Sequence, residues 1–142
     1  MTNKYLPDND ARTQLRDVLA AAMDAHRAGD LFMADRLYGE VLGIDPDHLK
    51  ALRLRGILAR ECGDIDKSLA LLQRAHTVAP ADPEPLGEIA IAQMTVGDLY
   101  AAEHSLRQAL ALNPQAVRTL VNLGALLQHR GHVQTAITFY EQ

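Results

Sequence analysis

The sequence predicts an all-α protein built from pairs of antiparallel helices that recur at a constant interval along the chain. The interval is visible in a column of evenly spaced glycines at Gly29, Gly63, Gly97 and Gly131. A column of prolines lies midway between successive glycines, at Pro46, Pro80 and Pro114. Repeats of this length, about 34 residues, are typical of proteins in which each unit packs only on its neighbours.

Each unit begins with a helix that ends at its glycine. About fourteen residues with apolar side chains three and four apart precede the glycine, which is the period of a helix. Glycine ends a helix by adopting the left-handed conformation. Asp30, Asp64 and Asp98 directly follow three of the glycines and are suited to cap the next helix, which the proline then ends. We therefore expect second helices to begin near Leu31, Ile65, Leu99 and Val133.

Small residues mark the place where the two helices of a unit approach each other. Seven residues before each glycine stand Ala22, Gly56, Ala90 and Gly124, and five residues after it stand Ala34, Ser68, Ala102 and Ala136. Because these columns keep the phase of the glycines, we expect the small residues to face the partner helix.

The columns resemble those of the tetratricopeptide repeat family. The resemblance is best seen in Leu120-Val-Asn-Leu-Gly124 with Gly131 and Ala136, and in Gly97-Asp98 with Ala102, Leu106, Ala109 and Asn113-Pro114. It implies a right-handed superhelix (solenoid) of helix-turn-helix pairs, with repeats at 15–48, 49–82 and 83–116 and an incomplete fourth at 117–142. Residues 1–14 are expected to hold an N-terminal extension and the start of a first helix longer than its counterparts, since Asp8, Asn9 and Asp10 offer caps.

The second repeat departs most from the family pattern. Arg55 stands where the pattern has leucine before Gly56. Its stem either runs past the core to solvent or its guanidinium pairs with an acid such as Glu88 or Asp66. His76 replaces a leucine of the pattern in the same repeat.

Composition excludes several classes of protein. The 142 residues carry 14 basic and 18 acidic side chains, a net charge of −4, which argues against binding to nucleic acid. The single cysteine, Cys62, excludes an internal disulfide and fits a reducing compartment. The first residues lack the pattern of a signal peptide and no apolar run approaches the ~20 residues of a membrane span. We therefore expect a cytoplasmic protein that does not bind membranes.

No catalytic, metal or cofactor site is predicted. The two serines, Ser68 and Ser105, have no nucleophile motif around them. His129 and His132 are three residues apart, but Gly131 ends the helix between them and should place them on different faces.

The resemblance implies that the first helices line the concave side of the superhelix. Residues three, six, ten and thirteen before each glycine share one helical face there. The predicted binding groove consists of Arg16, Leu19, Met23, His26, Lys50, Arg53, Ile57, Arg60, Glu84, Ile91, Met94, Arg118, Val121 and Gln128. The cluster of Lys50, Arg53 and Arg60 favours an acidic partner segment, while the alternative for each residue is ordinary solvated helix surface.

A known way of binding in this family does not fit the groove. One subclass grips the C-terminal carboxylate of chaperone tails with a Lys/Asn/Asn/Lys/Arg clamp. The corresponding places hold Leu19, Met23, Leu54, Glu84 and Glu88, or, one repeat later, Arg53, Ile57, Glu88, Arg118 and Asn122. Neither set matches. Asn122 resembles the asparagine that recurs along the grooves of nucleotide-sugar transferase repeats.

The sequence therefore predicts a non-catalytic interaction module that holds a peptide segment of a partner protein. Two alternatives remain: a substrate-recruiting arm of a larger glycosyltransferase, sulfotransferase or hydroxylase, and a small secretion chaperone. The fourth repeat is too short for a full second helix, so the chain is expected to be a fragment of a longer protein. Its end should leave an apolar face that consists of Leu123, Leu127, Ile137 and Phe139. Two copies could form a homodimer through this face.

Overall fold

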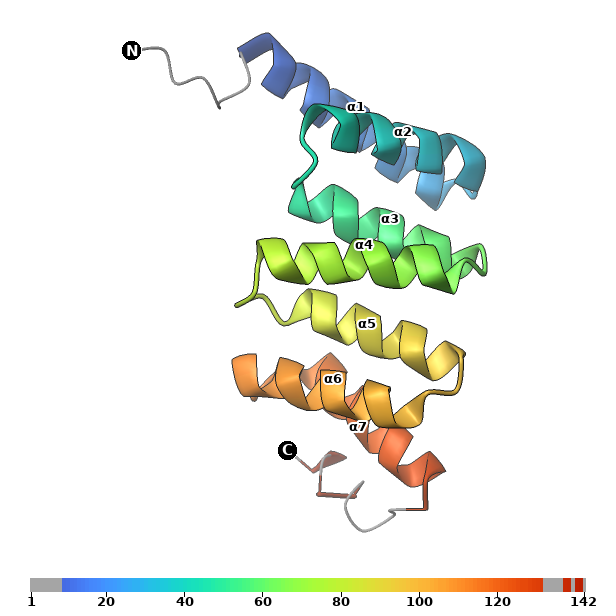
Figure 1. The fold of residues 1–142 in the computed structure, drawn as a ribbon, viewed down its shortest axis with the longest axis vertical. Helices are drawn as coiled ribbons and strands as arrows, with labels where there is room; N and C mark the ends of the chain where they lie inside the picture. Colours follow the sequence, from blue (N-terminus) through green and yellow to red (C-terminus); the bar gives the residue numbers. More distant parts are fainter. Residues whose placement is uncertain (1–8, 132–136, 139, 142) are drawn as a thin grey trace.

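The computed structural model describes residues 9–131, 137–138 and 140–141. It contains α1 (Asn9–Arg27), α2 (Leu31–Ile44), α3 (Leu49–Glu61), α4 (Ile65–Val78), α5 (Glu84–Thr95), α6 (Leu99–Leu112) and α7 (Val117–His129). No strand occurs in this part of the chain. The predicted all-α fold is confirmed (Figure 1).

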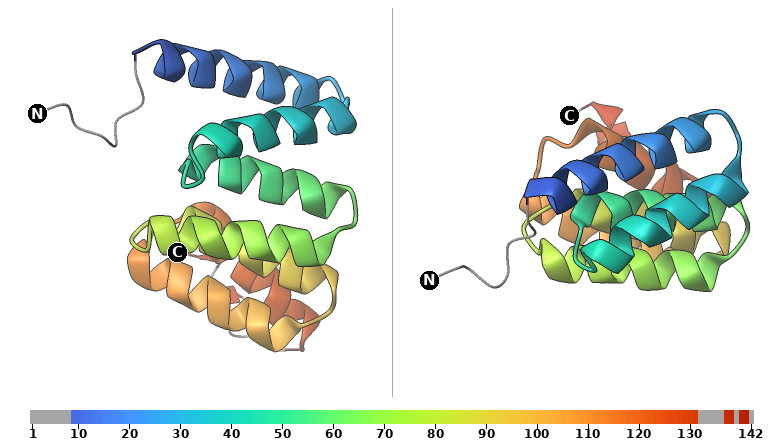
Figure 2. Two further views of the ribbon diagram at one scale, coloured as in Figure 1. Left: turned by 45° about the horizontal axis from the view of Figure 1, so that its top comes forward. Right: turned by 90° about the horizontal axis from the view of Figure 1, so that it is seen from above.

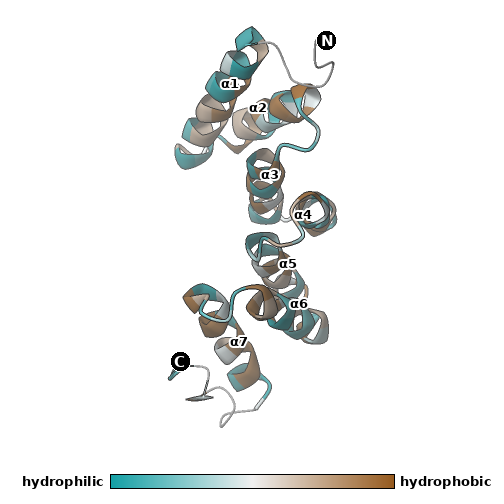
Figure 3. Cartoon of the chain, turned by 90° about the vertical axis from the view of Figure 1, so that its left-hand side faces the viewer, coloured by the Kyte–Doolittle hydropathy of each residue, from teal (hydrophilic) through white to brown (hydrophobic). Residues whose placement is uncertain are grey.

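The helices form a stack of antiparallel pairs that runs along the long axis of the molecule (Figures 1 and 2). Figure 3 shows α1, α3, α5 and α7 on one side of the stack and α2, α4 and α6 on the other. In Figure 3, α1 and α7 at the two ends lie further to the left than α3 and α5, so the surface that the odd-numbered helices form is concave. Among the described residues, no helix is long and apolar enough to span a membrane.

The turn within each pair has the predicted construction. Gly29, Gly63, Gly97 and Gly131 all have φ near +80°, at 82°, 82°, 81° and 81°. The carboxylates of Asp30, Asp64 and Asp98 each accept a hydrogen bond of 3.1 Å from a backbone N–H three residues further on. The second helices begin at Leu31, Ile65 and Leu99 as predicted, whereas Val133 lies outside the described residues.

The first helix is longer than its counterparts, as predicted. α1 has 19 residues, and α3, α5 and α7 have 13, 12 and 13.

A large side chain recurs at one position of the paired helices, and two of these side chains contact the small residue of the first helix. Tyr38, Leu72 and Leu106 stand nine residues after their glycines and are fully buried. A Cβ on Gly56 would lie 2.7 Å from Cγ of Leu72, and a Cβ on Gly124 would lie 2.9 Å from the ring of Tyr140. The helices therefore approach each other at the small residues, as the sequence predicted.

The expected bare face at the end of the chain is wrong for two of its four residues. Leu123 and Leu127 are buried, and Ile137 is 40% exposed. The side chain of Phe139 lies outside the described residues. Association of two copies through this end stays a prediction.

Arg55 is paired, but with neither of the acids that the sequence suggested. Its Nε and Nη2 donate to the two carboxylate oxygens of Asp35 in α2, at 2.9 and 3.2 Å. Nζ of Lys67 donates to the same carboxylate at 3.0 Å. The guanidinium passes over Gly39, where a Cβ would stand 3.3 Å from Nη2. The hydrogen bonds from Arg55 lower the pKa of Asp35 against the opposing effect of burial, and Lys67 adds to the lowering.

Replacing Gly56 with leucine tests the contact with Leu72. We expect Gly56→Leu to lower the free energy of unfolding by about 1–3 kcal/mol, because the new side chain overpacks the interface of α3 and α4. Gly43→Leu is the matched control, since nothing lies within 4 Å of a Cβ at Gly43. Urea unfolding should show the loss for Gly56→Leu alone. Equal effects of the two substitutions would mean that Gly56 does not face α4.

The pairing of Asp35 predicts a pH-dependent contribution to stability. A carboxylate whose pKa is lowered by folding stabilises the folded state above its unfolded pKa of about 4, and this contribution is lost as the pH falls through the folded pKa. We expect Asp35→Asn to be less stable than the wild type at pH 7, with a difference that shrinks below about pH 4. Asp17→Asn, an exposed position on α1, is the control. A difference for Asp35→Asn that does not change with pH would contradict the prediction.

Candidate peptide-binding groove

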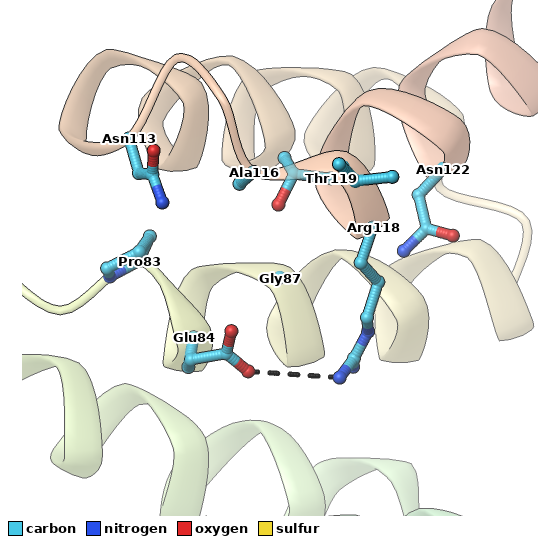
Figure 4. A pocket seen from close by; sticks show the side chains of 9 residues that line it. Pro83, Glu84, Gly87, Asn113, Ala116, Arg118, Thr119 and Asn122 are labelled. Carbon is cyan, nitrogen blue, oxygen red and sulfur yellow. Dashed lines mark ion pairs between the residues drawn. The ribbon is translucent and has the colours of Figure 1, made fainter. Parts of the chain in front are cut away.

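A chain of ion pairs crosses the concave face from α3 to α7. Its centre is Glu88 of α5, whose side chain is only 4% exposed. One carboxylate oxygen accepts a 3.0 Å hydrogen bond from Nη1 of Arg60 in α3, and the other accepts from Nη2 of Arg118 in α7. Nη1 of Arg118 also lies 3.8 Å from Glu84 (Figure 4). The hydrogen bond to Glu88 raises the pKa of Arg118, so its guanidinium stays charged.

Arg60 is therefore not part of a free basic cluster. The sequence grouped Arg60 with Lys50 and Arg53, but Glu88 neutralises its charge from the next repeat. The periodicity of the sequence assigned Arg60 to the groove face but did not indicate that Glu88 is its partner.

His26 connects the first two repeats in a similar way. Its Nε2 lies 2.6 Å from Oε2 of Glu61 in α3, and its Nδ1 lies 3.2 Å from the hydroxyl of Tyr38. Burial raises the pKa of Tyr38, and the charge of Glu61 raises it further, so the phenol remains protonated. His26 thus joins α1 to α3 and is not a free side chain of the groove.

Three predicted cations have no such partner. Arg16, Lys50 and Arg53 make no hydrogen bond or ion pair with any residue that the structure describes. They lie in the N-terminal halves of α1 and α3, on the left in Figure 1. Nε of Arg53 is buried without an acceptor. These three cations form a positive edge at the starts of α1 and α3. Along the same edge, at the starts of α5 and α7, Glu84 and Arg118 pair with each other. Near the ends of α1 and α3, His26 and Arg60 are paired with carboxylates.

An apolar pocket of about 220 Å³ lies between the first two repeats. Its walls are Met23, His26, Arg27, Tyr38 and Leu54. Met23 and His26 were predicted for the groove, but Leu54 was not. Leu54 directly follows Arg53, so the pocket is close to the positive edge.

A second pocket, of about 160 Å³, lies between α5 and α7 (Figure 4). Gly87 keeps it open, because nothing lies within 4 Å of where its Cβ would stand. Figure 4 shows the side chain of Asn122 reaching from α7 toward α5 at this place. Gly87 lies ten residues before Gly97, on the helical face that the sequence assigned to the groove, and Asn122 is the residue that resembles the groove asparagine of the transferase repeats.

The remaining predicted residues also lie on the odd-numbered helices. Leu19, Ile57, Ile91 and Met94 are partly buried, and Val121 and Gln128 are exposed. The structure therefore gives the groove an apolar middle, with unpaired cations at the starts of α1 and α3 and with the other predicted charged residues paired.

Comparison with known proteins defines the class to which this fold belongs. No family model matches the chain. A mutant O-GlcNAc transferase from Thermobaculum terrenum is 31% identical, with a TM-score of 0.77 over 86% of this chain and 23% of the transferase chain. MamA from Desulfovibrio magneticus is 19% identical, with a TM-score of 0.79 over 89% of this chain and 72% of MamA. The first TPR of Spaghetti (RPAP3), bound to an HSP90 peptide, is 13% identical, with a TM-score of 0.77 over 84% and 94%.

These likenesses identify a solenoid of helix pairs. Together with the repeat columns, they show that the fold is of the tetratricopeptide repeat type, as the sequence predicted. The chain spans only 23% of the length of the transferase.

Of the charged residues on the concave face, Glu88 is expected to contribute most to the free energy of unfolding. Glu88→Gln removes the charge between two arginines, and Arg60, whose side chain is 17% exposed, would face a neutral amide. We expect unfolding free energy to fall by about 1–3 kcal/mol. Glu84→Gln is the control, because Glu84 is half exposed and should cost about 0.5 kcal/mol or less. Denaturant titration that finds equal losses would contradict this role.

Proposed function

We propose that the concave groove holds a peptide segment of a partner protein and that these helices carry out no catalysis. The observation that carries the proposal is the row of unpaired cations, Arg16, Lys50 and Arg53, beside the apolar pocket at Met23 and Leu54. Every other predicted groove arginine has an acidic partner. The TPR of Spaghetti (RPAP3), which has the same fold, is bound to a peptide.

The chemistry of this edge favours an acidic segment with an apolar side chain. Unpaired cations on a concave surface attract acidic groups and guide their approach. Because Leu54 adjoins Arg53, an extended segment could place an apolar side chain in the pocket while neighbouring carboxylates meet Lys50 and Arg53. Such exposed charge contacts give modest affinity, on the order of micromolar, that falls with salt.

A second candidate is supported by the likeness to the transferase. In that proposal the same groove recruits protein substrates to a catalytic domain of a larger protein, of which this chain would be one part. The 31% identity over 86% of this chain favours it. The length of the natural reading frame separates the two candidates.

Charge reversal at the positive edge tests the groove. Short peptides selected on the wild-type protein from a displayed random library should be enriched in Asp, Glu and large apolar residues. By fluorescence anisotropy, Lys50→Glu/Arg53→Glu should weaken the binding of these peptides by about tenfold or more, because the attraction becomes repulsion.

The control is Arg36→Glu/Arg74→Glu, which changes net charge equally at exposed positions of α2 and α4. It should leave affinity nearly unchanged, and both double variants should keep the helical circular dichroism of the wild type. Unchanged binding by Lys50→Glu/Arg53→Glu would place the ligand elsewhere.

A further inference from the structure

A third pocket lies away from the groove, where the first and second repeats meet. It has a volume of about 330 Å³ between the start of α2, the end of α3 and the start of α4. The α1–α2 and α3–α4 turns lie along this side of the molecule, on the right in Figure 1. Phe32, which is 82% exposed, forms part of its wall. The other lining residues are Leu31, Asp35, Leu58, Ala59, Cys62, Asp64 and Lys67.

The same place two repeats later is occupied by an arginine of this chain. Tyr100 and Glu103 hold the repeat positions of Phe32 and Asp35, and Arg130 holds the repeat position of Cys62. Cζ of Arg130 lies 4.2 Å from the centroid of the Tyr100 ring. Nη1 of Arg130 donates a hydrogen bond to Glu103. There, the end of the first helix of one repeat places a guanidinium on an aromatic ring and a carboxylate of the repeat before it.

The first two repeats keep the ring and the carboxylate but not the guanidinium. Cys62 is too short and carries an exposed thiol. Among the described residues, no cation lies over the ring of Phe32. The pocket is thus the counterpart of the Arg130 site in which Lys67 occupies the carboxylate and no guanidinium covers the ring.

Asp64 is the carboxylate of the pocket that is open to a further cation. Asp35 is paired with Arg55 and Lys67, just as Glu103 is paired with Arg107 and Arg130. Asp64 caps α4 with one carboxylate oxygen and makes no ion pair within the described part of the chain. Asp64 can therefore supply the negative charge for an incoming group that stacks on Phe32.

A guanidinium fits this combination better than the other side chains do. It is planar and weakly hydrated, so it stacks on an aromatic ring while its edge donates hydrogen bonds to a carboxylate. A purely apolar side chain would cover Phe32 but would also desolvate Asp64 without a partner. An acidic side chain would meet Asp64 and Asp35.

We infer that the pocket formed by Phe32, Cys62 and Asp64 binds an arginine side chain of a partner protein. The site lies on the side of the even-numbered helices and is independent of the proposed groove function. It would give the chain a second contact with the same partner or with another one.

Small probes test the inference directly. The amide resonances of Leu31, Phe32 and Cys62 should shift in NMR spectra when N-acetyl-arginine amide is added, with a dissociation constant on the order of millimolar. N-acetyl-citrulline amide has the same shape without the charge and should bind about fivefold more weakly or not at all. N-acetyl-leucine amide tests an apolar occupant.

Two variants locate the response. Cys62→Arg should place the chain's own guanidinium on Phe32, so the added arginine derivative should no longer shift these resonances. Phe32→Ala should abolish the shifts as well, whereas Tyr100→Ala, at the filled counterpart, should leave them unchanged. Equal shifts with the citrulline or leucine derivative, or shifts that persist in Cys62→Arg, would overturn the inference. Neither result would bear on peptide binding in the groove.

Discussion

The close contact between the two helices of each repeat is the constraint on which the rest of the fold depends. A small residue seven positions before the turn glycine meets a large side chain nine positions after it, Gly56 with Leu72 and Gly124 with Tyr140. At the same repeat positions, Ala22 and Tyr38 share one core cluster, and Ala90 and Leu106 share another. The turn between them is fixed by a left-handed glycine and a capping aspartate. Both residues of the contact lie within one repeat, so each helix pair is determined by residues that are close in the sequence. The opposite face of every first helix takes no part in this contact.

The charged side chains on these opposite faces of the first helices are of two kinds: some pair with one another, and others have no partner among the described residues. On α5 and α7 the charged residues satisfy one another through Glu88, and on the C-terminal half of α1 His26 bonds to Glu61. Among the residues that the structure describes, only the N-terminal halves of α1 and α3 keep cations without partners. The charged residues that the sequence assigned to the groove are therefore of two kinds, and in the described part of the chain the unpaired positive charge of this face is confined to the first two repeats.

Features that depend on residues close in the sequence could be predicted, whereas ion pairs that connect two repeats could not. The starts of α2, α4 and α6 follow from a glycine and an aspartate one or two residues away, so they could be located to the residue. The partner of Arg55 could not, because Asp35 lies 20 residues earlier and is reached only over Gly39. Arg60 and Glu88 are 28 residues apart. Periodicity assigns a residue to a helix face, but the rotation between successive repeats decides which residues of that face meet.

The carboxylate of Glu88 has a mechanical consequence for the array. In a linear stack, units at an end normally separate most easily, because each has only one neighbour. The buried carboxylate of Glu88 binds guanidinium groups from the repeats on both sides. Separating either interface would therefore leave this carboxylate with one guanidinium partner in place of two. The second, third and fourth repeats should therefore open as one cooperative block and resist bending relative to one another. The first repeat, joined by the half-exposed Glu61, is the more compliant segment, and it carries Arg16, one of the three cations of the positive edge.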